Sequence, residues 1–269
     1  MKLGLMSSVC PQQSLVELIE TAKTYGYAGI EFRAQWGHRH GIELEASKSD
    51  LQRARRQLMD SGIAVSCIAT GVRFNSPEAA DHLPQRELLH RYIELAAHVG
   101  APYLRTFSDP LPEDAPSARD AVLDLAAASY AAVDSWAAHH GVVVLVETHT
   151  NMKAEWARRI LDAAKADHLQ VLWHIEHHLS RGQSVDDAYG LLQGHIRHVH
   201  FSAQPGTVAE MPPGAASPNA RMFELLAAEG FAGFFSVEII NPDDDHTVLV
   251  LHADKYATYV AAADAPRYP

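Results

Sequence analysis

The sequence of 269 residues has only two cysteines, no long apolar run and no excess of basic residues. Cys10 and Cys67 cannot build a disulfide framework, and neither has a second cysteine at metal-binding spacing, so we expect two small buried hydrophobic side chains. No stretch approaches the roughly 18 consecutive apolar residues that a membrane-spanning helix needs. The start, MKLGLMSSVC, lacks a full apolar signal region, and we therefore expect a cytoplasmic protein that does not enter a membrane.

The formal net charge of -11 argues against nucleic acid as a partner. Proteins that bind a phosphate backbone usually carry a basic face that releases counterions. Histidine, in contrast, is abundant, with 17 copies. Because histidine is the commonest metal ligand and titrates near neutral pH, the positions of these residues bear on function.

Short β-rich runs alternate with longer segments of helical periodicity along the chain. The predicted strands are residues 2–6, 29–32, 63–69, 103–108, 142–148, 169–175, 196–202 and 233–240. Parallel strands need right-handed crossovers, so eight strand–helix units close naturally into a barrel. The sequence thus predicts one (β/α)8 TIM barrel domain over residues 1–269. An open doubly wound sheet is the alternative, but no G-x-G-x-x-G follows the first strand to support it.

A repeated joint between helix and strand supports the barrel. The segments YGYAGIE, EGFAGFFSVE, AAHVGAPYLR and AAHHGVVVLVE all contain it. Each has a glycine where the C-terminus of a helix favours positive φ, namely Gly26, Gly230, Gly100 and Gly141. Segments 70–84, 109–117 and 203–218 are rich in Pro, Ser, Asn and Asp, and we predict loops there, at the carboxyl rim where barrels keep their active sites.

Each of the last four predicted strands carries a potential metal ligand near its end. These residues are Glu147, His174, His200 and Glu238. Side chains at this height of a barrel converge on its axis, so residues far apart in sequence can meet. A single glutamate could be a solvated rim residue and a single histidine a hydrogen-bonded core residue. Four at corresponding heights favour a divalent-metal site, in which a carboxylate removes a proton next to a carbonyl while the ion holds the resulting enediolate oxygens.

The chain resembles the xylose-isomerase-like superfamily of sugar phosphate isomerases and epimerases. The similarity rests on GYAGIEF, ETH, LWHIEHH, RHVHFS and GFFSVEI, and it covers nearly the whole chain. It implies a barrel in which Glu, Asp, His and Glu on the last four strands hold a divalent ion. Glu147, His200 and Glu238 match these ligands, and the resemblance implies that Glu147 and Glu238 also act as acid and base. It further implies a homo-oligomer, since relatives are often dimers or tetramers.

The strand-6 ligand departs from the family pattern. His174 stands where relatives have Asp, in His174-Ile175-Glu176-His177, and the resemblance implies that His177 contacts substrate. The exchange removes a negative charge and adds a nitrogen donor, which favours a transition ion (Zn, Mn, Co or Fe) over Mg or Ca. A weakened or lost metal site is the alternative, and Glu176 could substitute as a ligand. After His200 the family's Lys-Asp and the arginine of ketose 3-epimerases are missing, so no particular sugar is implied.

Further polar residues are predicted at the same rim. The candidate substrate-binding residues are His177, His149, Arg105, Arg33, Arg73, His38 and His40. Three arginines at one rim of an acidic protein suggest an anionic substrate with a carboxylate or phosphate, although each alone could be a surface or salt-bridge residue. Trp36, Phe74 and Phe107 could wall the binding cavity or pack the barrel mouth.

These observations predict a metal-dependent isomerase or epimerase that shifts a proton in a small, sugar-like hydroxy-carbonyl compound. A lyase on the same site, similar to inosose dehydratases, is one alternative. A catalytically degraded barrel that only binds a metabolite is another, because a fold alone does not establish activity. An endonuclease is disfavoured by the acidic charge and by the lack of a larger histidine-rich ligand set.

Overall fold

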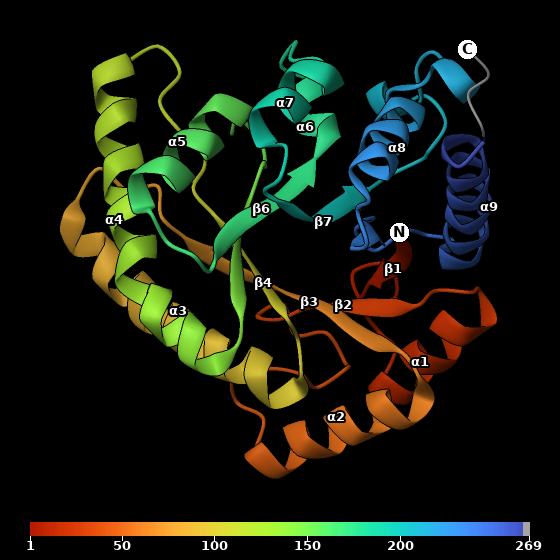
Figure 1. The fold of residues 1–269 in the computed structure, drawn as a ribbon. Coiled ribbons are helices and arrows are strands. Elements are labelled where there is room, and N and C mark those ends of the chain that lie inside the picture. Colours follow the sequence, from red (N-terminus) through yellow and green to blue (C-terminus); the bar gives the residue numbers. More distant parts are fainter. Residues whose placement is uncertain (266–269) are drawn as a thin grey trace.

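The strands of the computed structural model, which describes residues 1–265, close into a parallel barrel in the order β1 to β8, with β8 beside β1 (Figure 1). The strands are Lys2–Met6 (β1), Gly29–Arg33 (β2), Ala64–Arg73 (β3), Tyr103–Phe107 (β4), Val143–Glu147 (β5), Leu169–His174 (β6), Ile196–Phe201 (β7) and Phe234–Val237 (β8). The predicted (β/α)8 barrel is confirmed.

Helices surround the strands, as Figure 1 shows. They are Leu15–Thr24 (α1), Lys48–Ser61 (α2), Ala79–Val99 (α3), Pro116–His140 (α4), Ala154–Ala164 (α5), Ile175–Leu179 (α6), Val185–Leu192 (α7), Pro218–Glu229 (α8) and Asp245–Ala263 (α9). Two short 3-10 turns, Val208–Glu210 and Gly214–Ala216, lie between β7 and α8. Within residues 1–265, no helix is long and apolar enough to cross a membrane.

Local signals set the helix ends as the sequence predicts. Ser14 caps α1 in a reciprocal capping box with Glu17. Gly100, Gly141 and Gly230 end α3, α4 and α8 in the left-handed conformation, with φ of 82°, 65° and 76°. These glycines allow the chain to turn from each helix into the next strand without a Cβ clash.

The loop prediction for residues 70–84 is wrong over most of its length. β3 continues to Arg73, and α3 begins at Ala79 with Pro84 inside the helix. Thr70 donates a side-chain hydrogen bond to the carbonyl of Arg105 on β4, which continues the contact between the strands beyond the predicted end. A proline near the start of a 21-residue helix removes only one of many backbone hydrogen bonds, so composition alone overstated its breaking effect.

The barrel interior has a thin apolar layer beneath a polar one. Cys67, Leu145 and Leu172 form a separate buried cluster, while the main apolar core lies between strands and helices. Cys10 and Cys67 are both free and buried, as predicted. Other buried side chains are charged or polar, among them Glu31, Arg105, Glu147 and His198.

The turn into β8 provides a test of the packing at the opposite end of the barrel. A Cβ at Gly233 would lie 2.5 Å from the backbone carbonyl oxygen of Arg197, whereas a Cβ at Gly190 in α7 would meet nothing within 4 Å. We expect Gly233→Ala to lower the free energy of unfolding by roughly 1–3 kcal/mol, because the strands must shift apart. Gly190→Ala is the control and should leave stability unchanged or raise it by up to about 1 kcal/mol in urea denaturation. Equal stabilities of the two variants would contradict this account.

Candidate active site

Four predicted ligands come together at the carboxyl rim. Glu147 and His174 end β5 and β6, His200 lies in β7, and Glu238 directly follows β8. Their ligand atoms all lie within 4.8 Å of one another. His200 Nδ1 is 2.9 Å from Glu147 Oε1 and 2.9 Å from Glu238 Oε2, and His174 Nδ1 is 3.3 and 3.4 Å from the same oxygens. We call these four residues the cage.

The donor set and spacing of the cage fit a divalent ion. Ligand bonds of about 2.0–2.1 Å give a tetrahedron with edges of about 3.3–3.4 Å. The contacts of His174 match this edge, while the shorter contacts of His200 are those of a hydrogen-bonded imidazolium. Two carboxylates and two imidazoles suit a transition ion such as zinc. Glu176 lies outside the cage, with Oε2 4.0 Å from His174 Nε2.

Charge coupling in the cage is strong because the groups are buried. Burial alone would lower the pKa of His200, but the carboxylates of Glu238, Glu147 and Glu31 raise this pKa well above its ordinary value. Burial would likewise raise the pKa of Glu238, but His200 above all brings it down to about 2. For Glu147, His200 and then Arg105 overcome the effect of burial and hold the pKa well below its ordinary value.

A second buried cluster supports His200 from behind. Glu31 Oε1 lies 3.1 Å from His200 Nε2, and Glu31 Oε2 lies 2.8 Å from His198 Nε2. A carboxylate that accepts from Nε2 of His200 fixes the tautomer and presents Nδ1 to the cage, an arrangement common behind metal-binding histidines. Neither Glu31 nor His198 is among the site residues predicted from the sequence. The i, i+2 spacing of His198 and His200 was the available signal, because alternate strand residues face the same side.

Arg105 is held by an ion pair with Glu147 of the cage. Its Nε lies 3.2 Å from Glu147 Oε2, and its guanidinium donates to the carbonyl of Thr70 at 2.9 Å. Only 1% of its side chain is exposed. The structure therefore pairs this predicted substrate-binding residue with Glu147, whose carboxylate it holds in place.

Two predicted histidines line the approach to the cage. The His177 ring lies 4.2 Å from that of His174 and 4.8 Å from that of His149, measured between centroids. Burial, followed by the charge of His174, lowers the pKa of His177 to about 3, so this imidazole is neutral. His149 Nδ1 lies 2.8 Å from Oδ2 of Asp109, a buried carboxylate that the sequence analysis did not single out. Both rings therefore lie beside the cage.

The remaining predicted residues divide by their partners. Arg73 donates to the Asp109 carbonyl and stacks on Phe107, whose ring centroid is 4.6 Å away. His38 Nδ1 lies 3.0 Å from Ser7 Oγ. His40 is buried, accepts from the backbone of Ile42 and lies 3.3 Å from the Arg33 carbonyl, so it holds the loop after β2.

The aromatic residues at the mouth have two uses. Phe74 is fully buried and packs on His82 and Tyr130. Trp36 and Phe107 instead stack with arginines. The Cζ atom of Arg33 lies 4.1 Å from the centroid of the Trp36 ring, and that of Arg105 lies 4.1 Å from the centroid of the Phe107 ring. Phe74 thus has the packing role expected from the sequence, and a wall role for Trp36 and Phe107 stays a prediction.

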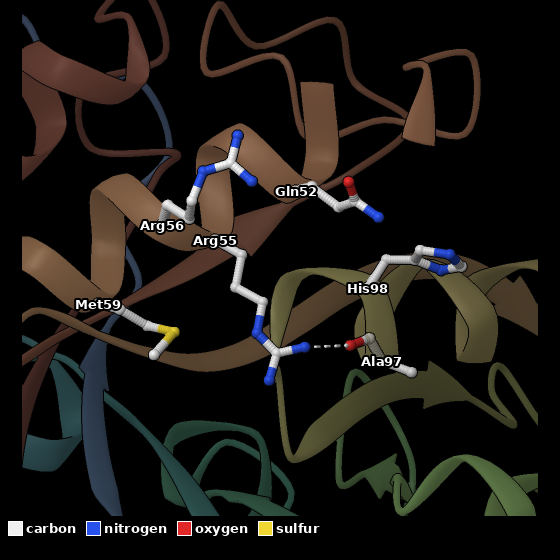
Figure 2. Close-up of a pocket in the computed structure, with 6 residues that line it drawn as sticks. All are labelled: Gln52, Arg55, Arg56, Met59, Ala97 and His98. Atoms are coloured by element: carbon white, nitrogen blue, oxygen red, sulfur yellow. Dashed lines mark hydrogen bonds between the residues drawn. The ribbon is translucent and has the colours of Figure 1, made fainter. Parts of the chain in front are cut away.

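A cavity of about 490 Å³ lies away from the cage, between α2 and α3 (Figure 2). Figure 2 shows Arg55 reaching from α2 to the carbonyl of Ala97, at 3.5 Å. The lining residues are Gln52, Arg55, Arg56, Met59, Ala97 and His98. No predicted site residue lines it, so volume alone does not mark the chemistry of this barrel.

The comparisons agree with the fold. The family described as xylose isomerase-like TIM barrel matches residues 19–258. The chain belongs to this family. No curated protein sequence matches this xylose isomerase-like barrel.

Solved structures similar to this xylose isomerase-like barrel span its length. An L-ribulose 3-epimerase is 18% identical with a TM-score of 0.76, covering 100% of this chain and 99% of the other. The probable 3-DHS dehydratase AsbF of Bacillus anthracis is 17% identical with a TM-score of 0.75, covering 96% and 99%. An IOLI protein with a bound zinc atom is 16% identical with a TM-score of 0.76, covering 99% and 100%. At such identities these likenesses establish the fold of this xylose isomerase-like barrel.

The contact between Glu31 and His200 predicts an effect on metal affinity. Glu31→Gln removes the charged acceptor that orients His200, and we expect zinc affinity to fall by roughly 10- to 100-fold. Competition with a chromophoric chelator measures the affinity. Glu45→Gln, at an exposed position in the loop before α2, is the control. Unchanged zinc affinity in Glu31→Gln would remove Glu31 from the metal centre.

The raised pKa of His200 predicts the pH dependence of metal binding. Without an ion, its imidazole stays protonated above its ordinary pKa because three carboxylates surround it. Coordination requires the neutral ring, so metal binding releases a proton and tightens as pH rises toward the folded-state pKa. Calorimetry in buffers of different ionisation enthalpy counts the protons. A binding constant that does not vary with pH would show that His200 is not a ligand.

Proposed function

We propose that this protein is a metal-dependent isomerase or epimerase that moves a proton next to the carbonyl of a small, sugar-like compound. One observation carries the proposal. Two carboxylates, Glu147 at the end of β5 and Glu238 after β8, each lie 2.9 Å from the same nitrogen of His200. Two bases at one point can take a proton from one position of a substrate and return it at another.

The two glutamates differ in how they are held. Glu147 is completely buried and paired with Arg105, which favours its charged form and fixes its direction. Glu238 follows the last strand at the rim, has no arginine partner among the described residues, and exposes 15% of its side chain. We assign Glu238 as the main proton acceptor and Glu147 as a ligand and second acid/base group.

The bound ion supplies a positive charge that stabilises negative charge on a substrate oxygen. We assign the neutral ring of His177 and the neighbouring ring of His149 to orient substrate hydroxyls by hydrogen bonds. Burial of three of the four cage residues lowers the local dielectric, which strengthens each electrostatic contact. The donor set supports zinc, manganese, cobalt or iron as the ion.

A lyase is the second candidate. The same base would remove a proton, and loss of a hydroxyl from the neighbouring carbon would then give a dehydrated product. Similarity to the probable 3-DHS dehydratase AsbF favours keeping it. The predicted homo-oligomer stays a prediction, and light scattering of the purified protein measures it.

Replacement of the proposed base tests the mechanism. Glu238→Gln keeps an oxygen at the cage but cannot accept a proton, so turnover should fall by roughly 10²–10⁴-fold. NMR in deuterated water, with a panel of ketoses and keto-polyols, follows both deuterium incorporation and loss of water. Deuterium incorporation at constant mass indicates an isomerase, and loss of water indicates a lyase.

Glu45→Gln is the matched control for Glu238→Gln and should retain full turnover. Elemental analysis of protein purified without added metal accompanies these assays. Full activity in Glu238→Gln would exclude it as the base. Protein that takes up no transition metal would favour the metabolite-binding barrel instead.

A further inference from the structure

The three rim arginines are in different situations. Arg105 is paired with Glu147, and Arg73 contacts the carbonyl of Asp109 with the Asp109 carboxylate 3.8 Å away. The guanidinium of Arg33 has no hydrogen-bond or ion-pair partner among residues 1–265, and its Nε is buried without an acceptor. A buried donor without an acceptor costs free energy, so its persistence calls for an explanation.

The surroundings hold Arg33 in place without using its donors. Its guanidinium lies 4.1 Å over the ring of Trp36, and its backbone nitrogen donates to Ser7 Oγ at 2.9 Å. Gln35, between the two stacked residues, has a φ of 87° and accepts from the backbone of Gly71. Stacking supports the flat face of a guanidinium and leaves the N–H groups at its edge free for a planar anion.

Arg33 also lies within electrostatic range of the cage. Burial lowers the pKa of Arg33, the charge of Arg105 lowers it further, and the charges of Glu238, Glu147 and Glu31 oppose this. The guanidinium of Arg33 therefore interacts electrostatically with these glutamates and with Arg105. Arg33 therefore lies close enough to Glu238 for the two charges to interact.

The charge balance of the loaded site favours an anion. Glu31, Glu147 and Glu238 contribute three negative charges, and a divalent ion, Arg33 and Arg105 together contribute four positive ones. The two imidazoles of the cage are neutral when they bind an ion. Among these groups one positive charge remains, and the only further carboxylate within 4.0 Å of a cage residue in the described part of the chain is the partly exposed Glu176, beside His174.

We propose that Arg33, supported by Trp36, binds a carboxylate or phosphate group of the substrate whose hydroxy-carbonyl end lies at the cage. The substrate class is thus an acidic or phosphorylated polyhydroxy compound, and a neutral sugar lacks the group that Arg33 recognises. This inference rests on the proposed function for the position of the reacting end. It narrows the anion recognition predicted from three arginines to one residue.

Three probes with the same six-carbon backbone test the inference. D-gluconate carries a carboxylate, D-glucitol 6-phosphate carries a phosphate, and D-glucitol carries neither. Calorimetric titration gives the affinity of the zinc-treated wild type and of Arg33→Gln for each. Because zinc itself prefers a charged oxygen, the decisive quantity is the anion-over-glucitol preference in the wild type compared with that in Arg33→Gln.

We expect the wild type to prefer at least one anionic probe over glucitol by tenfold or more. Arg33→Gln should lose roughly 10-fold or more of its affinity for that probe, as expected for hydrogen bonds to a charged group, and keep its affinity for glucitol. The preferred probe tells a carboxylate from a phosphate. Arg33→Lys keeps the charge without the planar guanidinium, so its affinity for that probe should lie between those of the wild type and Arg33→Gln.

Arg56→Gln is the control, since this exposed arginine of α2 lies at the cavity away from the cage (Figure 2). Its probe affinities should equal those of the wild type. Circular dichroism checks that each variant folds. The inference is overturned if the wild type binds no anionic probe, shows no preference for one, or keeps its preference in Arg33→Gln.

Zinc affinity of each protein is measured separately from the probe titrations, which are run whether or not zinc binds. Wild-type protein that takes up none of zinc, manganese, cobalt and iron overturns the proposed function. Wild-type protein that binds zinc but shows no preference dependent on Arg33 overturns only the anion site. The two failures are therefore distinguishable.

Discussion

The imidazole of His200 is the group on which the rest of the site depends. It is buried, and both of its nitrogens contact carboxylates: Nδ1 faces Glu147 and Glu238, and Nε2 faces Glu31. Three negative charges around one ring would be destabilising without a cation, because charges buried in protein must be compensated. A proton on His200, or an ion in the cage, supplies that compensation. A proton and a metal ion would therefore compete for this one position.

Much of the fold, and the cage itself, could be predicted from sequence because both follow from periodicity and strand ends. Glu147, His174, His200 and Glu238 were found because a closed barrel brings equivalent positions on consecutive strands together. The pairing of Glu31 with His198 could not be read in this way, since β2 and β7 are not neighbours and their contact crosses the barrel. The same limit holds for the rim arginines. Their residue type predicts that they can bind anions, but only the tertiary structure shows which group each arginine contacts.

The histidine at position 174 changes the balance of charge without removing a donor. Its Nδ1 points to both cage carboxylates, at 3.3 and 3.4 Å, so the geometry of a four-donor site is kept. A carboxylate there would add a fourth negative charge to a group that already contains Glu31, Glu147 and Glu238. A neutral ring instead makes the loaded site more positive, which links the choice of this ligand to the kind of molecule the rim attracts.

Trp36, which supports Arg33, lies in the connection after β2. This position bears on how such a barrel can diverge in evolution. Within residues 1–265, no hydrogen bond, ion pair or ring contact joins Trp36, His38 or His40 to the four cage residues. Arg105, by contrast, cannot change without disturbing Glu147. Insertions or exchanges between residues 34 and 41 would thus alter which molecule is accepted while the reaction itself is inherited intact.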